Sequence, residues 1–320
     1  MSQHIKRYLT HEEALQMVNF QRDQAVKFDE SMASRGSPIT HDEALEILHE
    51  RCMSGAELYR FLLSLRLMHL TGGVVQHGPL AGFSIGTRAT WRASDNGAKL
   101  LGFYEKEVCD LMVELAGERE TLVDLGGADG FYAVGMVKTG VYQQCHCFEI
   151  EDVSRENIAE IAKENGVQDN VHIYGAATST FARELSDRGV DLARSTVLVD
   201  IESAEFEVLT LECLQDLRCA HVIVEIHDFM RPHDGKQRYA ELLERAAQVF
   251  DVRTFTTGPR DPSQAPLLAR GWTDTDRWLV CSESRATLMT WLHLAPKGRY
   301  SQPRTTVSVS ASACRHDESV

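Results

Sequence analysis

The chain has 320 residues, of which 43% are hydrophobic and 25% are charged, so it is long enough for one large domain with an accessory segment. Its formal net charge of −14 argues against a nucleic-acid backbone as the main partner, because proteins that bind one usually carry a basic face. The sequence contains neither a bilayer-spanning apolar run nor a secretory signal, and its scattered cysteines fit a reducing compartment. We therefore expect a cytoplasmic protein that binds neither nucleic acid nor a membrane.

Residues 1–95 are predicted to form a mainly helical amino-terminal extension. Two capping-box sequences, at Thr10-His11-Glu12-Glu13 and Thr40-His41-Asp42-Glu43, each predict a helix start. Apolar residues at helical spacing predict a third helix over 56–70. Glycines from residue 72 to residue 97 then interrupt the pattern, which fits either a lid beside the active site or an ordinary connector. We expect the helices either to cap the substrate pocket or to form a homodimer.

Residues 96–285 are predicted to form one α/β domain. Short apolar runs alternate with helical runs, which favours a parallel sheet covered by helices on both faces. Two further runs, Val252 to Thr256 and Arg277 to Cys281, are candidates for a closing antiparallel hairpin. Residues 286–320 are expected to be a mobile tail, since residues 301–320 are rich in Ser, Thr and Val. The five predicted parallel strands cover residues 121–123, 145–148, 171–174, 196–199 and 221–224.

The loop after the first predicted strand, from Asp124 to Gly130, has the composition of a cofactor loop. A dinucleotide-binding loop needs a third Gly where this chain has Phe131, and it binds a pyrophosphate rather than a cation. The Asp124 carboxylate instead complements the ammonium and sulfonium groups of S-adenosylmethionine. The small residues Gly126, Gly127 and Ala128 are expected to let the backbone approach that cofactor.

Four other positions complete the predicted cofactor site, and one of them is Asp200, directly after the fourth strand. The second strand ends at Glu149, 23 residues after Gly126, where an acid can accept hydrogen bonds from both ribose hydroxyls. Tyr104 precedes the first strand and is a candidate to pack on the methionine end of the cofactor. Ala176, in a run of small residues after the third strand, is expected to leave space for the adenine.

The most distinctive stretch, Val197 to Leu209, reads VLVDIESAEFEVL. It resembles the Asp-(Ile/Val)-Glu-Gly-Ala-Glu signature of FkbM-type methyltransferases. The cofactor loop resembles that family's first motif, and the resemblance covers about residues 100–283. It implies a Rossmann-like class I methyltransferase fold and methyl transfer from S-adenosylmethionine, commonly to a hydroxyl of a small natural product or sugar. Ser203 stands where the family usually has Gly, and its side chain is expected to narrow the nearby substrate space.

Acids and a histidine follow the fourth and fifth predicted strands, which should be neighbours in this fold. Asp200 and Glu202 follow the fourth strand, and Glu225 and His227 follow the fifth. His227 is the first candidate for the base that removes the acceptor proton, with Glu225 or Asp200 orienting its ring. In the alternative, Asp200, Glu202, Glu225 and His227 hold a divalent metal that lowers the pKa of the acceptor hydroxyl.

The sequence thus predicts a methyltransferase that uses S-adenosylmethionine to methylate a hydroxyl of a small molecule. Two alternatives stay open. One is a nicotinamide-dependent oxidoreductase, against which the missing third Gly and the Asp before the loop both count. The other is a non-catalytic protein that binds S-adenosylmethionine and docks a partner through its amino-terminal helices. The acids and the histidine after the fourth and fifth strands speak against that reading.

Overall fold

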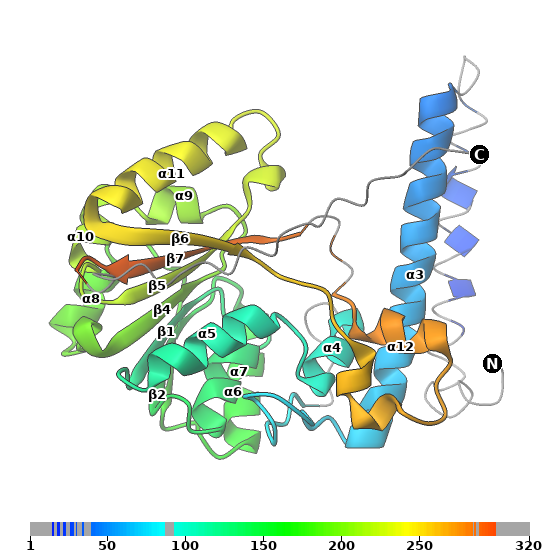
Figure 1. Cartoon of the computed structure of the whole chain (residues 1–320), viewed down its shortest axis with the longest axis horizontal. Coiled ribbons are helices and arrows are strands. Elements are labelled where there is room, and N and C mark those ends of the chain that lie inside the picture. The colour runs from blue at the N-terminus through cyan, green and yellow to red at the C-terminus, as the bar shows by residue number, and fades with distance from the viewer. Residues whose placement is uncertain are drawn as a thin grey trace, which may run out of the picture.

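The computed structural model describes residues 40–86, 93–283, 285 and 288–298, with scattered positions between 15 and 34. Seven strands in this part form one sheet in the order β3-β2-β1-β4-β5-β7-β6 (Figure 1). Neighbours among β1 to β5 are parallel, whereas β7 runs antiparallel to both β5 and β6. Helices cover both faces of the sheet. The predicted Rossmann-like α/β sheet with helices on both faces is confirmed.

The five predicted parallel strands are confirmed, but the antiparallel hairpin is not formed by the predicted pair of segments. Helix α12, Asp274–Cys281, replaces the strand expected at Arg277 to Cys281, because Thr273 and Asp276 form a capping box that starts a helix. The partner of β6 is instead β7, which lies beyond the expected end of the domain at residue 285. The strands are β1 Thr121–Leu125, β2 Gln144–Phe148, β3 Val171–Tyr174, β4 Ser195–Val199, β5 His221–Ile226, β6 Phe250–Thr256 and β7 Thr290–Pro296.

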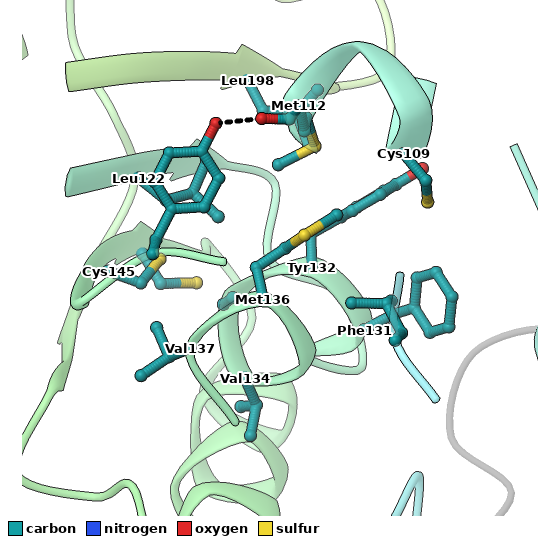
Figure 2. Close-up of a cluster of buried hydrophobic side chains, with 14 of the residues drawn as sticks. Cys109, Met112, Leu122, Phe131, Tyr132, Val134, Met136, Val137, Cys145 and Leu198 are labelled. Carbon is teal, nitrogen blue, oxygen red and sulfur yellow. Dashed lines mark hydrogen bonds between the residues drawn. The ribbon is translucent and has the colours of Figure 1, made fainter. Parts of the chain in front are cut away.

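One face of the sheet is covered by α5 Lys106–Ala116, α6 Phe131–Lys138 and α7 Asp152–Glu164 (Figure 1). Figure 2 shows side chains of α6, such as Met136, and of α5, such as Met112, in one apolar cluster beside the strands. All but the last residue of α6 are buried, so this helix holds the loop before it in a fixed position. Tyr142 donates a hydrogen bond of 2.9 Å to the Met112 carbonyl, the dashed line in Figure 2.

The opposite face is covered by four helices and contains a second apolar cluster. Residues 205–216 form two short helices in place of one continuous helix, because the chain leaves helical geometry at Leu209 and Thr210 caps a new start. These short helices leave the residues just after β4 free to turn toward the carboxyl edge of the sheet. The four helices are α8 Phe181–Asp187, α9 Glu205–Val208, α10 Leu211–Asp216 and α11 Gly235–Val249.

The described part of the amino-terminal extension is dominated by α3, His41–Thr71, which stands beside the sheet domain as a long rod (Figure 1). Thr40 caps it in the predicted capping box, and the helices expected at residues 41 and 56 are one continuous helix. Its carboxyl-terminal half packs on α4, Asn96–Leu101, and on α12. Most of the predicted helix after Thr10 and residues 299–320 lie outside the described residues. None of the described helices is long and apolar enough to cross a membrane.

The glycine-rich stretch after α3 is a packed connector along its described part, residues 72–86. Val75, Leu80 and Phe83 are buried in the same apolar cluster as α6. The Asn165 side chain accepts a hydrogen bond from the Ser84 amide and donates one to the Ser84 carbonyl, at 3.0 and 2.9 Å. The connector is therefore fixed to the sheet domain by apolar contacts and by two hydrogen bonds to Asn165.

Candidate active site

The loop from Gly126 to Gly130 joins β1 to α6 at the carboxyl edge of the sheet. Gly126 has a φ of 94°, and a Cβ there would lie 1.7 Å from the carbonyl oxygen of Asp200. A Cβ on Gly127 would lie 2.2 Å from the Cys147 sulfur. The space above these two glycines is therefore filled by the protein itself, and they are required for close packing of three strand ends. The expected approach of their backbone to a cofactor is a separate property and stays a prediction.

Asp124 lies on β1 and is fully enclosed, with 1% of its surface exposed. Neither of its carboxylate oxygens has a hydrogen-bond partner within the described part of the chain. Burial, and then the nearby carboxylates of Asp200 and Glu149, raise the pKa of Asp124 to about 8. A buried carboxylate without a partner is costly unless it is protonated or faces a cation. With a pKa of about 8, Asp124 is largely protonated near neutral pH, and a positively charged ligand beside it would favour its ionised form.

Glu149, at the end of β2, is tied to the cofactor loop. Its Oε2 accepts a hydrogen bond of 2.7 Å from the Ala128 amide, and its Oε1 accepts one of 2.9 Å from the Glu151 amide. Ile150 and Val153 beside it are 70% and 69% exposed, which is unusual for large apolar side chains next to a buried acid. Ala176, after β3, is exposed at the same edge.

Tyr104 and helix α4 approach the loop from the other side. The Lys99 ammonium on α4 lies 2.5 Å from the Asp129 carboxylate in the loop, with 5% of the Lys99 side chain exposed. Lys99 also lies over the Tyr104 ring, 5.0 Å from its centroid, and Tyr104 packs edge-on against Phe131. Tyr104 is thus held beside the loop, where its predicted contact with a cofactor stays a prediction, and the contribution of Lys99 and Asp129 was not anticipated.

The predicted acids and histidine meet after β4 and β5, because these strands are parallel neighbours. The His227 Nε2 lies 3.5 Å from Asp200 Oδ1, 3.7 Å from Glu202 Oε2 and 3.4 Å from Glu225 Oε2. On the other side of the ring, Nδ1 lies 3.5 Å from Glu205 Oε1. All four predicted side chains therefore converge on one point.

The charges in this cluster shift one another's protonation. Burial lowers the pKa of a histidine, but the carboxylates of Glu205, Glu225 and Asp200 outweigh it and raise the pKa of His227 to about 11. The pKa of Asp200 is held well above its usual range by burial and then by the charge of Glu225. Near neutral pH the imidazole is therefore positively charged and neutralises part of the surrounding negative charge.

Glu205 has a role that the sequence alone did not assign. It begins α9, as an acid at the positive end of a helix should, and it is fully buried. Its Oε1 also accepts a hydrogen bond of 2.8 Å from the His227 amide. Because Glu205 contacts both the backbone and the ring of His227, it fixes that residue in place.

The turn before α9 has an unusual backbone. Glu202 and Ser203 both adopt positive φ angles, 51° and 81°, which residues other than glycine rarely adopt. A glycine at position 203 would adopt this geometry without steric cost. The turn directs a half-exposed Glu202 carboxylate toward His227.

Arg285 is a site residue that sequence reasoning missed. Its guanidinium bonds the Glu225 carboxylate at 2.9 Å and the Glu283 carboxylate at 3.2 Å, and it also pairs with buried Glu105. Glu105 accepts a further hydrogen bond from the Tyr132 hydroxyl. Arg285 thus connects the residue after Tyr104 to the acid beside His227. No motif surrounds it, since it lies in the segment that leads into β7.

No family model matches the sequence, and no curated protein has significant similarity to it. Among solved structures, a spermidine synthase in complex with the transition-state analogue AdoDATO matches at 14% identity and a TM-score of 0.40, over 61% of this chain and 59% of that one. An O-methyltransferase from Bacillus cereus in complex with SAH matches at 7% identity and a TM-score of 0.41, over 61% and 80%. A spermidine synthase from Thermotoga maritima matches at 12% identity and a TM-score of 0.41, over 61% and 60%. This chain spans about three fifths of the length of these two synthases.

Because these identities and TM-scores are low, the matches assign neither a cofactor nor a reaction to this chain. The function proposed below is therefore argued from its own residues.

Proposed function

We propose that this protein is a methyltransferase that uses S-adenosylmethionine to methylate a hydroxyl group of a small molecule. The observation that carries the proposal is Asp124, a buried carboxylate with two unpartnered oxygens at the start of the loop. A cationic cofactor would complement it, whereas a pyrophosphate would repel it. This feature also speaks against the nicotinamide alternative.

The rest of the loop fits the same cofactor. Glu149 uses one hydrogen bond on each carboxylate oxygen, which leaves further lone pairs for ribose hydroxyls. Ile150 and Val153 are exposed apolar side chains next to it, as a bound adenine ring would require. Tyr104 is held beside the loop at the expected methionine end. When bound, S-adenosylmethionine supplies a methyl group activated by its sulfonium.

The cluster after β4 and β5 supports an acceptor that must lose a proton. Methyl transfer to an alcohol requires the O–H proton to leave, and a histidine surrounded by carboxylates can receive it. We assign this role to His227, with Asp200 and Glu225 as its partners. His227 must first give up the proton that its high pKa holds, and a positive charge bound nearby would favour that loss.

The resemblance to FkbM-type methyltransferases is part of the proposal. Its support is the turn at Ser203, where a φ of 81° matches the family's usual Gly. A hydroxyl acceptor is favoured over an amine, because a cluster of this kind is needed to remove a proton from an alcohol. A non-catalytic binding protein would not need the charged cluster of Asp200, Glu225 and His227, so this cluster favours an enzyme.

Calorimetric titration of the full chain with S-adenosylmethionine and with NAD tests the cofactor. We expect binding of the first and no binding of the second; binding of NAD alone would overturn the proposal. Transfer from isotopically labelled S-adenosylmethionine to small-molecule extracts, detected by mass spectrometry, then tests the reaction. A product carrying the labelled methyl on oxygen is expected, and the same label on nitrogen would refute the hydroxyl assignment.

A further inference from the structure

Three side chains at the carboxyl edge of β4 and β5 offer ligand atoms to one point in space. One oxygen of Asp200, one oxygen of Glu202 and one ring nitrogen of His227 all lie within 4.8 Å of one another. The two carboxylate oxygens lie 3.5 and 3.7 Å from the His227 Nε2. Neighbouring ligands of a six-coordinate ion with bonds of roughly 2.1 Å lie about 3 Å apart, so a small closure of these side chains would form a site.

The state of His227 is a second and independent indication of a ligand. Its side chain is 4% exposed, so its ring nitrogens are shielded from bulk solvent. Its Nε2 faces three carboxylates at 3.4 to 3.7 Å, beyond the ordinary range of hydrogen bonds. The ring is therefore buried and directed at the point on which the carboxylates converge.

The far side of the imidazole has the partner that metal-binding histidines require. Glu205 Oε1 lies 3.5 Å from Nδ1, and Glu205 is fully buried with its Oε2 unpartnered. When an ion displaces the Nε2 proton, a carboxylate behind the ring fixes the tautomer in which Nε2 binds the metal. Because Glu205 also accepts from the His227 amide, the ring and its partner are oriented as one unit.

We propose that Asp200, Glu202 and His227 bind a divalent transition-metal ion, with Glu205 behind the histidine. Two carboxylates and one imidazole suit Mn²⁺ better than Mg²⁺, because Mg²⁺ prefers oxygen ligands alone. Glu225 is not a ligand: Arg285 bonds its Oε1 and holds it beside the site. Glu202 is half-exposed, which leaves a route for the ion to enter.

The site leaves coordination positions for a substrate oxygen, because the chain supplies only three ligands. An ion there would lower the pKa of an acceptor hydroxyl bound beside it, and this effect would replace the base role of His227. This role of the ion rests on the proposed function, whereas binding of the ion does not.

Electron paramagnetic resonance with Mn²⁺ alone tests the site on the full chain without cofactor. We expect wild type to reduce the free Mn²⁺ signal with saturation at one ion per chain. Glu202→Gln is expected to weaken Mn²⁺ binding at least tenfold. Because Glu202 is half-exposed, the variant should fold as wild type does, and circular dichroism checks this. Glu212→Gln, an exposed acid on α10, is the matched control and should bind as wild type does.

Two results would overturn this inference. One is a wild-type signal that stays free at millimolar Mn²⁺. The other is equal binding by wild type and Glu202→Gln, which would mean that the ions bind diffusely to an acidic surface. Titration of the same samples with S-adenosylmethionine separates this inference from the proposed function. Cofactor binding without Mn²⁺ binding refutes only the metal site, and Mn²⁺ binding without cofactor binding refutes only the proposed function.

Discussion

The two halves of the candidate site are built in different ways. On the cofactor side, Asp124, the glycine loop and Glu149 lie within 30 residues of one another and are joined mainly through backbone hydrogen bonds. On the acceptor side, Asp200, His227 and Arg285 come from segments far apart in the chain and are joined through side chains. The first half is therefore set by local sequence, and the second by the order of strands in the sheet. Variants on the two sides should accordingly separate cofactor binding from turnover.

The largest effect is expected from His227→Gln. Because His227 faces three carboxylates at the acceptor edge, its loss should lower kcat about 1000-fold, the usual range for a lost acid–base group. The affinity for S-adenosylmethionine should stay within about threefold, by analogy with general-base variants that keep ground-state binding. Calorimetry and a methyl-transfer assay measure the two quantities. His233→Gln, on an exposed loop, should change neither. If His227→Gln lost cofactor binding, the cofactor side and the acceptor side would not be functionally independent.

Arg285→Ala should cause the next largest effect, on stability. The change leaves the carboxylates of Glu105, Glu225 and Glu283 without their shared cation, and breaking such a buried pair costs about 3 kcal/mol. Urea denaturation measures the free energy of unfolding. The control Arg238→Ala removes a partly exposed pair with Glu207 and should cost less than about 1 kcal/mol. Equal losses in the two variants would show that Arg285 is not central to the acceptor side.

Asp124→Asn is expected to weaken cofactor binding while stabilising the cofactor-free protein. The folded-state pKa of Asp124 is about 8 against an ordinary 3.8, so wild type loses stability as the pH rises between these values. Asp124→Asn has no such titration, so its free energy of unfolding should equal that of wild type near pH 4. It should exceed the wild-type value by about 2 kcal/mol near pH 8, after discounting for relaxation. Thermal unfolding across this pH range measures it. The exposed Asp169→Asn should show no such trend. An advantage that is independent of pH would contradict the raised pKa.

Ser203→Gly should give the smallest effect. Glycine adopts a φ of 81° without the steric cost that a Cβ imposes, so the variant should be more stable by about 0.5–1 kcal/mol. Urea denaturation again measures the difference. The same substitution at Ser186, inside helix α8, should instead lower stability by about 0.5 kcal/mol. A destabilised Ser203→Gly would mean that the serine side chain makes a contact that outweighs the strain.

The predicted fold followed from periodicity, and its errors have physical causes. The parallel strands were predictable because each is a short apolar run bounded by turns, and helix α6 was predictable over its whole length. The strand expected at Arg277 is a helix because a capping box overrides the β-forming residues near it. Strand β7 was not expected, since its pairing with β5 and β6 is a long-range contact that no local pattern announces.

The sequence by itself determined the chemistry at each strand end: an acid and glycines after β1, an acid after β2, and acids with a histidine after β4 and β5. These depend on residue type and on spacing along the chain, both of which can be read directly. Only the tertiary structure decided that Gly126 and Gly127 are required for close packing of the strand ends, that Glu205 lies behind His227, and that Arg285 holds Glu225. Such roles depend on which segments the sheet brings side by side, and that follows from burial of the whole core rather than from any single motif.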